Sequence, residues 1–298
     1  MVSKEFENLR RILKERKLSA EKKRVEEERR SFEQITALVS LPKDIKMIKF
    51  LVKAISCVWI ESPNCNQNNV IFYLHGGGYI TGSIDTNKDL VARIARVSES
   101  RVLFIEYRLA PEFPFPAALE DAISAYEWLI NTEHISPNNI IFFGESAGGG
   151  LALSTLIKIK ELSLQLPAAA ILLSPWVDLD FTGDSIKNNA KIDPFITFDT
   201  MLFYARLYIG NNNPRDPNIS PLYADLKDLP PLLIHVGSAE LLLDDSRRLA
   251  EKAKISGVDV ELEIWKDMTH VFHAFAGLIP EGQRAINKIG VFIRSLLN

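Results

Sequence analysis

The chain has little cysteine and little net charge, and each shortage removes a class of protein from consideration. Its 298 residues include two cysteines, Cys57 and Cys65, too few for a disulfide-rich secreted fold. We expect both thiols to be unpaired and the protein to be cytoplasmic. The net charge of −3 gives no electrostatic reason to bind nucleic acid or an anionic membrane.

Long apolar runs are also missing. No run approaches the roughly 20 residues of a membrane-spanning helix, and stretches such as residues 168–173 have the length of strands. The first five residues lack the apolar core of a signal peptide. We therefore expect neither stable membrane insertion nor export. With 47% hydrophobic and 24% charged residues, the sequence is typical of a globular protein with a large core.

From residue 45 onward, short apolar runs alternate with helix-length segments. Several runs are apolar throughout, as in strands covered on both faces. The alternation predicts an α/β fold, with a mostly parallel sheet between two layers of helices. Strands are predicted at residues 54–60, 70–74, 102–107, 140–143, 169–173, 232–236 and 260–265. Helices are predicted at residues 89–97, 117–131, 151–160, 241–255 and 283–297.

Two segments depart from this rhythm. Ser3 to Ser40 is dense in Lys, Arg and Glu, with apolar residues at roughly helical spacing. That pattern predicts one or two amphipathic helices lying on the body of the protein. Asp178 to Lys227 is long, aromatic and rich in proline and asparagine, and it lies between two predicted strands. Such insertions are often lids or binding elements.

A serine between two glycines stands directly after the predicted strand at 140–143. The sequence Gly144-Glu145-Ser146-Ala147-Gly148 is typical of a nucleophile elbow, a tight turn between a strand and a helix. The turn leaves no room for side chains at 144 and 148, so the hydroxyl of Ser146 is pushed outward. Because the pattern also occurs by chance, its context decides its meaning.

A serine hydroxyl needs a base to act as a nucleophile, and the base needs an acid to orient it. In an elbow fold the three follow in the order serine, acid, histidine. Of the five histidines, only His270 and His273 come after a plausible acid. Both follow the strand predicted to end at residue 265, at the sheet edge where such side chains gather. Chain order and loop position favour His270, with His273 as the rival.

The acid is expected just after the strand predicted at 232–236. Glu240, Asp244 and Asp245 all follow it, and any of them has the alternative role of a carboxylate at a helix N-terminus. Glu240 lies nearest the strand end and can project toward the loop that carries His270. Asp244 is the second choice.

Backbone donors for an oxyanion are also predicted. His75-Gly76-Gly77-Gly78 directly follows the strand predicted at 70–74. Glycines leave their N–H groups bare and allow a ligand to approach closely. Gly77 and Gly78, together with the amide of Ala147, would complete an oxyanion hole.

These motifs, taken together, resemble the hormone-sensitive-lipase-like branch of the α/β-hydrolases, whose members include bacterial and archaeal acyl esterases. The resemblance covers about residue 45 to the end. It rests on His75-Gly-Gly-Gly, Tyr107-Arg-Leu-Ala-Pro-Glu112, Phe115-Pro-Ala-Ala118, Gly144-Glu-Ser-Ala-Gly148, Ser174-Pro-Trp-Val-Asp-Leu179, Asp216-Pro-Asn-Ile-Ser-Pro-Leu222 and Leu229-Pro-Pro-Leu232.

The resemblance implies a role for each residue of the predicted site. Ser146 would be the nucleophile, His270 the base, and Gly77, Gly78 and Ala147 the oxyanion donors. It also implies a single α/β-hydrolase domain over residues 1–298, with a helical cap formed by residues 1–44 and 178–227.

Two positions depart from the branch's usual pattern. Glu145 stands in the elbow where an aspartate is common, and Glu240 stands where the triad acid is usually aspartate. A glutamate orients an imidazole equally well, with one more methylene of reach. We therefore expect Glu240 to be the acid.

The predicted function is that of a serine carboxylesterase acting on small-molecule acyl esters, without a metal or organic cofactor. The aromatic residues in the insertion and just before it predict a small apolar pocket and hence short- to medium-chain acyl groups. They are Trp176, Phe181, Phe195, Phe198, Phe203, Tyr204 and Tyr208. Two alternatives stay open: an amide or arylformamide hydrolase with the same triad, and a non-catalytic receptor like those for gibberellin in plants. The physiological ester and the oligomeric state, a homodimer included, also stay open.

Overall fold

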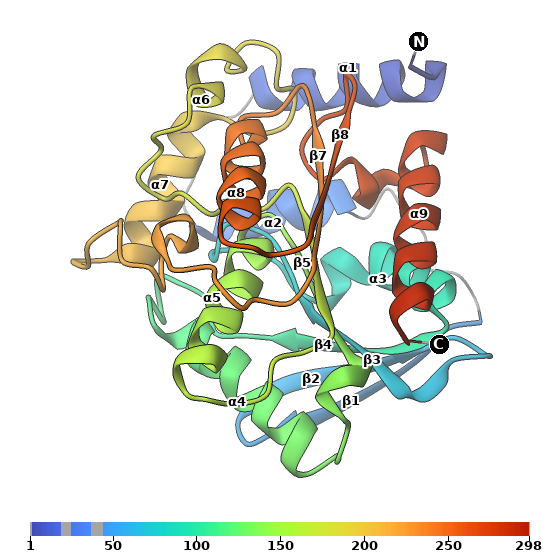
Figure 1. The fold of residues 1–298 in the computed structure, drawn as a ribbon. Coiled ribbons are helices and arrows are strands. Elements are labelled where there is room, and N and C mark those ends of the chain that lie inside the picture. Colours follow the sequence, from blue (N-terminus) through green and yellow to red (C-terminus); the bar gives the residue numbers. More distant parts are fainter. Residues whose placement is uncertain (1, 19–24, 37–43, 298) are drawn as a thin grey trace.

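The computed structural model describes residues 2–18, 25–36 and 44–297 (Figure 1). Positions 19–24 and 37–43, including part of the N-terminal segment expected to be helical, lie outside the described residues. The strands are β1 (Lys46–Val52), β2 (Ile55–Glu61), β3 (Asn66–Leu74), β4 (Ser100–Glu106), β5 (Ile140–Glu145), β6 (Ala169–Leu173), β7 (Leu232–Gly237) and β8 (Val260–Trp265). The helices are α1 (Lys4–Leu18), α2 (Val25–Thr36), α3 (Ile84–Ser98), α4 (Ala117–Asn131), α5 (Ala147–Glu161), α6 (Ser185–Asn188), α7 (Phe198–Ile209), α8 (Leu243–Ile255) and α9 (Pro280–Leu297).

The strands form one eight-stranded sheet in the order β1-β2-β4-β3-β5-β6-β7-β8. β1 pairs with β2 and β2 with β4 in antiparallel fashion, whereas every pairing from β4 onward is parallel. The predicted mostly parallel sheet is therefore confirmed. Parallel strands end at the same edge, so the segments that follow β3, β5, β7 and β8 meet in space.

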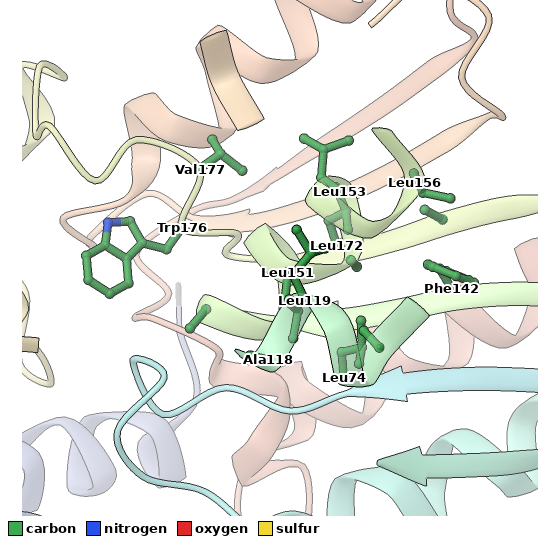
Figure 2. Close-up of a cluster of buried hydrophobic side chains, with 14 of the residues drawn as sticks. Leu74, Ala118, Leu119, Phe142, Leu151, Leu153, Leu156, Leu172, Trp176 and Val177 are labelled. Atoms are coloured by element: carbon green, nitrogen blue, oxygen red, sulfur yellow. The ribbon is translucent and has the colours of Figure 1, made fainter. Parts of the chain in front are cut away.

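Helices cover both faces of this sheet. α4, α5 and α8 pack on one face, and α3 and α9 pack on the other. Figure 2 shows the first face, where Leu74, Phe142 and Leu172 of the strands meet Leu119 of α4 and Leu151 of α5. β5 and β6 are buried along their whole length, which is why their sequences are apolar throughout.

Two predictions differ from the structure. No strand is predicted at the position of β1, and the start of α3 is predicted too late. β1 is an edge strand with mostly exposed or half-buried side chains, and Lys49 divides its apolar residues into a pair and a run of three. α3 begins at Ile84, five residues before the predicted start at 89, because Ser83 and Thr86 form a capping box there. The remaining predicted strands and helices match observed elements within a few residues.

The N-terminal segment contains two helices, as its amphipathic pattern predicts. Phe6, Leu9 and Leu13 of α1 are buried against a cluster that includes Phe272 and Phe275. The insertion between β6 and β7 contains α6 and α7. In Figure 1, α1 lies at the top of the view with α6 beside it. Lys17 of α1 also donates a hydrogen bond to this part of the insertion.

Both cysteines are free thiols: Cys57 is buried and Cys65 is half-buried. Within the described ranges, no helix combines the length and apolar character needed to cross a membrane.

Candidate active site

Ser146 occupies a strained turn at the carboxyl end of β5. Its backbone has φ 56° and ψ −121°, and α5 begins at the next residue. Side chains at Gly144 or Gly148 would collide with backbone atoms of Gly148 and Leu74 respectively. The glycines therefore allow β5 and α5 to meet at a sharp angle, which leaves the Ser146 hydroxyl at the edge of the sheet.

The side chains of Ser146, His270 and Glu240 form a row in which each is in hydrogen-bond contact with the next. The Nε2 atom of His270 lies 2.9 Å from Ser146 Oγ. Its Nδ1 atom lies 3.2 Å from Glu240 Oε1. His270 follows β8 and Glu240 follows β7, so both reach the site from the same sheet edge as Ser146. Glu240 is fully buried and His270 is 4% exposed, which shields both contacts from water.

The second carboxylate oxygen of Glu240 is also held. Glu240 Oε2 accepts hydrogen bonds from Ser174 Oγ at 2.8 Å and from the Gly237 N–H at 3.0 Å. The same Ser174 hydroxyl accepts the Val271 N–H at 3.1 Å. Ser174 thus links the glutamate to the histidine loop. No role in the site is predicted for Ser174 from the sequence, although its position directly after β6 places it at the same edge.

The rival residues have other partners. Nε2 of His273 lies 3.2 Å from Nδ1 of His235, and both rings are buried. Asp244 accepts the Ser185 N–H at 2.7 Å. Asp245 accepts the N–H groups of Val177 and Asp178, each at 3.0 Å. The structure therefore brings Ser146, Glu240 and His270 together and leaves His273, Asp244 and Asp245 outside the group.

Charges around His270 favour its protonated form. Burial lowers the pKa of the imidazole, but the hydrogen bond and charge of Glu240 oppose this. The charges of Asp193 and Glu145 add to Glu240, and the net result is a pKa above the ordinary value. An imidazole with this environment can accept a proton from a serine and hold the resulting charge.

The glycine turn after β3 faces the serine. Gly77 and Gly78 have φ angles of 109° and 65°, in the left-handed region that favours glycine. The Gly77 carbonyl accepts the N–H groups of Ile80 and Thr81, which closes the turn. Among the described residues, no acceptor contacts the N–H groups of Gly77, Gly78 or Ala147. Bare amides at this place suit an oxyanion.

Glu145 is a buried carboxylate next to the nucleophile. Its Oε1 atom accepts the Gly76 N–H at 2.5 Å, which ties the elbow to the glycine turn. Burial raises the pKa of this carboxyl to about 7, although the Gly76 bond and His270 oppose the shift. A side chain at Gly76 would collide with the carboxylate. The residue that departs from the common aspartate therefore fixes the spacing of the site.

A single cavity reaches Ser146, His270 and the glycine turn. Residues of α2, α3 and the insertion enclose it, and its wall has an apolar and a polar part. The apolar part consists of Phe32, Leu90, Trp176, Phe195, Ile196, Met201, Tyr204, Leu242, Val271, Ala274 and Phe275. The polar part includes Glu28, Asp85, Asn87, Lys88 and Asp89. In the portion of the chain that the structure describes, no cluster of His, Cys, Asp and Glu is arranged to hold a metal ion.

Only some of the aromatic residues predicted to form the pocket reach this cavity. Trp176, Phe195 and Tyr204 line it. Phe181 packs against Trp176, and Tyr208 stacks on Tyr79 with ring centroids 3.7 Å apart. The remaining two, Phe198 and Phe203, are exposed.

A family model for the alpha/beta hydrolase fold matches residues 71–274, about two thirds of the chain. The chain belongs to the α/β-hydrolase family. Among curated α/β-hydrolase relatives, an acetyl-hydrolase of Streptomyces hygroscopicus is 38% identical over 237 residues, covering 80% of this chain and 79% of the relative. An esterase of Acinetobacter venetianus is 36% identical over 232 residues, covering 78% of this chain and 76% of the relative.

Solved structures narrow the position within the family. An esterase from the bacterial hormone-sensitive lipase family superposes with a TM-score of 0.97 at 42% identity, and each chain is covered completely. A hormone-sensitive lipase from a metagenome library gives a TM-score of 0.95 at 36% identity, again over both complete chains. The predicted resemblance to the hormone-sensitive-lipase-like branch of the α/β-hydrolases is confirmed.

Proposed function

We propose that this carboxylic ester hydrolase acts through an acyl-enzyme intermediate on Ser146 and prefers short- to medium-chain acyl groups. The observation that carries the proposal is the line from Ser146 Oγ to His270 Nε2 at 2.9 Å and from His270 Nδ1 to Glu240 Oε1 at 3.2 Å. Curated relatives named esterase and acetyl-hydrolase support ester hydrolysis over a receptor role.

In the proposed mechanism, His270 takes the Ser146 proton while Oγ attacks the ester carbonyl. Glu240 holds the imidazole and stabilises the imidazolium that forms. His270 then protonates the leaving alcohol, and the acyl group stays on Ser146. Water enters, gives its proton to His270 and attacks the acyl carbonyl, which frees the acid and restores the serine.

The tetrahedral oxyanion would accept hydrogen bonds from the N–H groups of Gly77, Gly78 and Ala147. The amide of Ala147 opens α5, so the partial positive charge of the helix N-terminus adds to the stabilisation. Such preorganised donors act on charge that appears only in the transition state, and for this reason they lower the barrier without tightening substrate binding equally.

The proposal treats residues 1–298 as one domain whose cap is formed by residues 1–44 and 178–227. Described residues of both cap segments line the cavity, including Glu28 of α2 and Phe195 and Met201 of the insertion. The apolar part of the wall favours an aliphatic acyl chain, and closure by the cap favours a short one. The cytoplasmic location expected from the sequence stays a prediction, and the oligomeric state stays open, a homodimer included.

Ser146→Ala tests the nucleophile in hydrolysis of p-nitrophenyl butyrate. We expect kcat to fall by about 10⁴-fold or more, because no other hydroxyl can form the acyl-enzyme. Ser154→Ala is the matched control, since Ser154 lies on α5, is buried and has an unpartnered hydroxyl. Wild-type turnover by Ser146→Ala would contradict the proposal.

A series of p-nitrophenyl esters from acetyl to palmitoyl tests the acyl preference. We expect kcat/KM to be highest between acetyl and octanoyl and to drop for longer chains. Matched ester and anilide substrates measure the remaining alternative, amide hydrolysis. A higher kcat/KM for the anilide would favour that alternative.

A further inference from the structure

The loop that carries Glu240 is held from outside the sheet. It connects β7 to α8, and two side chains of the insertion reach it. Asn189 Nδ2 donates to the carbonyl oxygen of Glu240 at 2.8 Å and to that of Ser238 at 3.3 Å. Asp193 Oδ2 accepts the N–H of Leu241 at 2.9 Å. The backbone on both sides of the acid is therefore fixed by residues about 50 positions away in the chain.

Asp193 is built as a buried anion. It is 1% exposed, and its other oxygen accepts the N–H groups of Phe195 at 2.8 Å and Ile196 at 3.0 Å. Burial raises the pKa of this carboxyl, while the three N–H donors and the charge of His270 oppose the shift. The carboxylate thus holds two segments, the turn at Phe195 and Ile196 and the loop at Leu241, in one geometry.

α1 supports this arrangement from the other side. Lys17 Nζ donates to the Asp193 carbonyl oxygen at 2.6 Å and to the Ala190 carbonyl oxygen at 3.3 Å. The lysine thus closes the turn of the insertion that presents Asn189 and Asp193. A continuous set of contacts runs from α1 through this turn to the Glu240 loop and on to His270.

We propose that Asp193 is a positioning residue for the triad, which fixes the Glu240 loop through Leu241 and acts on His270 through its charge, with Asn189 and Lys17 supporting it. The proposal rests on the function proposed for Ser146, Glu240 and His270. It assigns to the insertion and α1 a part in catalysis as well as in enclosing the substrate.

Asn189 and Asp193 are absent from the cavity wall, which separates positioning from substrate binding. A change at either residue moves Glu240 and His270 relative to Ser146 without removing a surface that the substrate touches. The effect is therefore expected in kcat rather than in KM.

Asp193→Asn is the main test, in the full-length protein with p-nitrophenyl butyrate. Whichever way the amide faces, its NH₂ group meets a backbone N–H that the carboxylate accepted, so at least one of the three bonds is lost. We expect kcat to fall by about tenfold or more, with KM changed by less than about twofold. Asp199→Asn is the control, because it removes the same charge from an exposed position of the insertion.

The pH profile separates positioning from a general loss of structure. The charged groups that act on His270 are Glu240, Asp193 and Glu145, and each raises its pKa. Removing the charge of Asp193 lowers the pKa of His270, so the base stays neutral at lower pH. The acidic limb of kcat/KM should therefore move to lower pH in Asp193→Asn and stay in place in Asp199→Asn.

Two further variants keep the test decisive if Asp193→Asn fails to fold. Asn189→Ala removes the two hydrogen bonds from Asn189 to the Glu240 loop, and Lys17→Met removes the contact from α1. Because Lys17, unlike Asn189, also lines the cavity, Lys17→Met is expected to change KM as well as kcat. Lys14→Met is the control for the lysine, because Lys14 is exposed on the same helix. We expect a lower kcat in both test variants and the wild-type kcat in the control.

The outcomes distinguish this proposal from the one beneath it. If Ser146→Ala is inactive while Asp193→Asn, Asn189→Ala and Lys17→Met match their controls or wild type, the positioning role is wrong and the proposed function stands. If Asp193→Asn raises KM but leaves kcat and the pH profile unchanged, the positioning role is also wrong. If Ser146→Ala is active, the proposed function itself fails.

Discussion

The turn that carries Ser146 and the loop that carries Glu240 belong to one site, but different parts of the chain hold them. The Ser146 N–H donates to the Leu173 carbonyl oxygen at 2.8 Å, and the Ser146 carbonyl oxygen accepts the Trp176 N–H at 2.9 Å. Backbone contacts with the adjacent strand and loop therefore define this turn. The Glu240 loop has two backbone bonds of this kind, from the Ser238 and Ala239 N–H groups. At Glu240 and Leu241, however, it depends on side chains, which belong to Ser174, Asn189 and Asp193.

The two parts of the site therefore depend on different stretches of the sequence. The serine turn follows from five consecutive residues, two of which are glycines that allow backbone to touch backbone. The acid loop follows from side chains in two separate segments, which must fold correctly before the loop has its shape. A single substitution in the serine turn should therefore disrupt its shape completely. Substitution of a side chain that holds the Glu240 loop should disturb the shape of that loop only in part.

Glu240→Gln is expected to have the largest effect of the substitutions considered for this comparison. Glutamine keeps the shape but loses the charge that stabilises the imidazolium, so kcat should fall by about 10³- to 10⁴-fold. Asp244→Asn is the control, because Asp244 is bound to Ser185 instead. Steady-state hydrolysis of p-nitrophenyl butyrate measures both. An equal loss in the two variants would mean that Glu240 has no special role.

Gly78→Ala disturbs the oxyanion turn. A Cβ atom at Gly78 would collide with the ring of Tyr204, so the turn must shift. Its N–H groups then no longer point at the oxyanion. We expect kcat to fall by about 10²-fold. Gly210→Ala is the matched control: Gly210 has a similar φ of 60°, but a Cβ there meets no atom within 4 Å. Similar activities for the two variants would exclude the collision as the cause.

Arg29→Met tests how far α2 fixes the same turn, and its effect should be the smallest. Arg29 Nε donates to the Ile80 carbonyl oxygen at 2.9 Å, and its guanidinium forms two 2.8 Å bonds with Glu112. Because this contact is partly exposed, we expect kcat to fall by only about three- to tenfold. Arg30→Met, on the exposed side of α2, should keep the wild-type kcat. A higher KM with an unchanged kcat would assign Arg29 to substrate binding instead.

The parts that sequence alone could predict are those with local causes. Apolar runs long enough to be buried on both faces identify β5 and β6, and the glycine pattern identifies the turn at Ser146. Chain order limits the base to His270 and His273, and the position on the loop after β8 favours His270.

The parts that it could not predict have distant causes. β1 lies at an edge, and Lys49 interrupts its apolar residues. Ser174 and Asp193 are ordinary polar residues in the sequence, and their roles arise only when β6, β7 and the insertion come together. A side chain that bonds across 48 positions leaves no periodic signal in either segment.

The docking of α1 has a consequence for the order in which the protein is made. Phe6, Leu9 and Leu13 bury themselves against residues near Phe272 and Phe275, and Ser3 bonds Glu281. Ser3 and Glu281 lie 278 positions apart in the chain, so α1 finds its surface only after this later segment has been synthesised. Until then the apolar face of α1 stays uncovered, and the contacts that α1 makes with the rest of the esterase form late in synthesis.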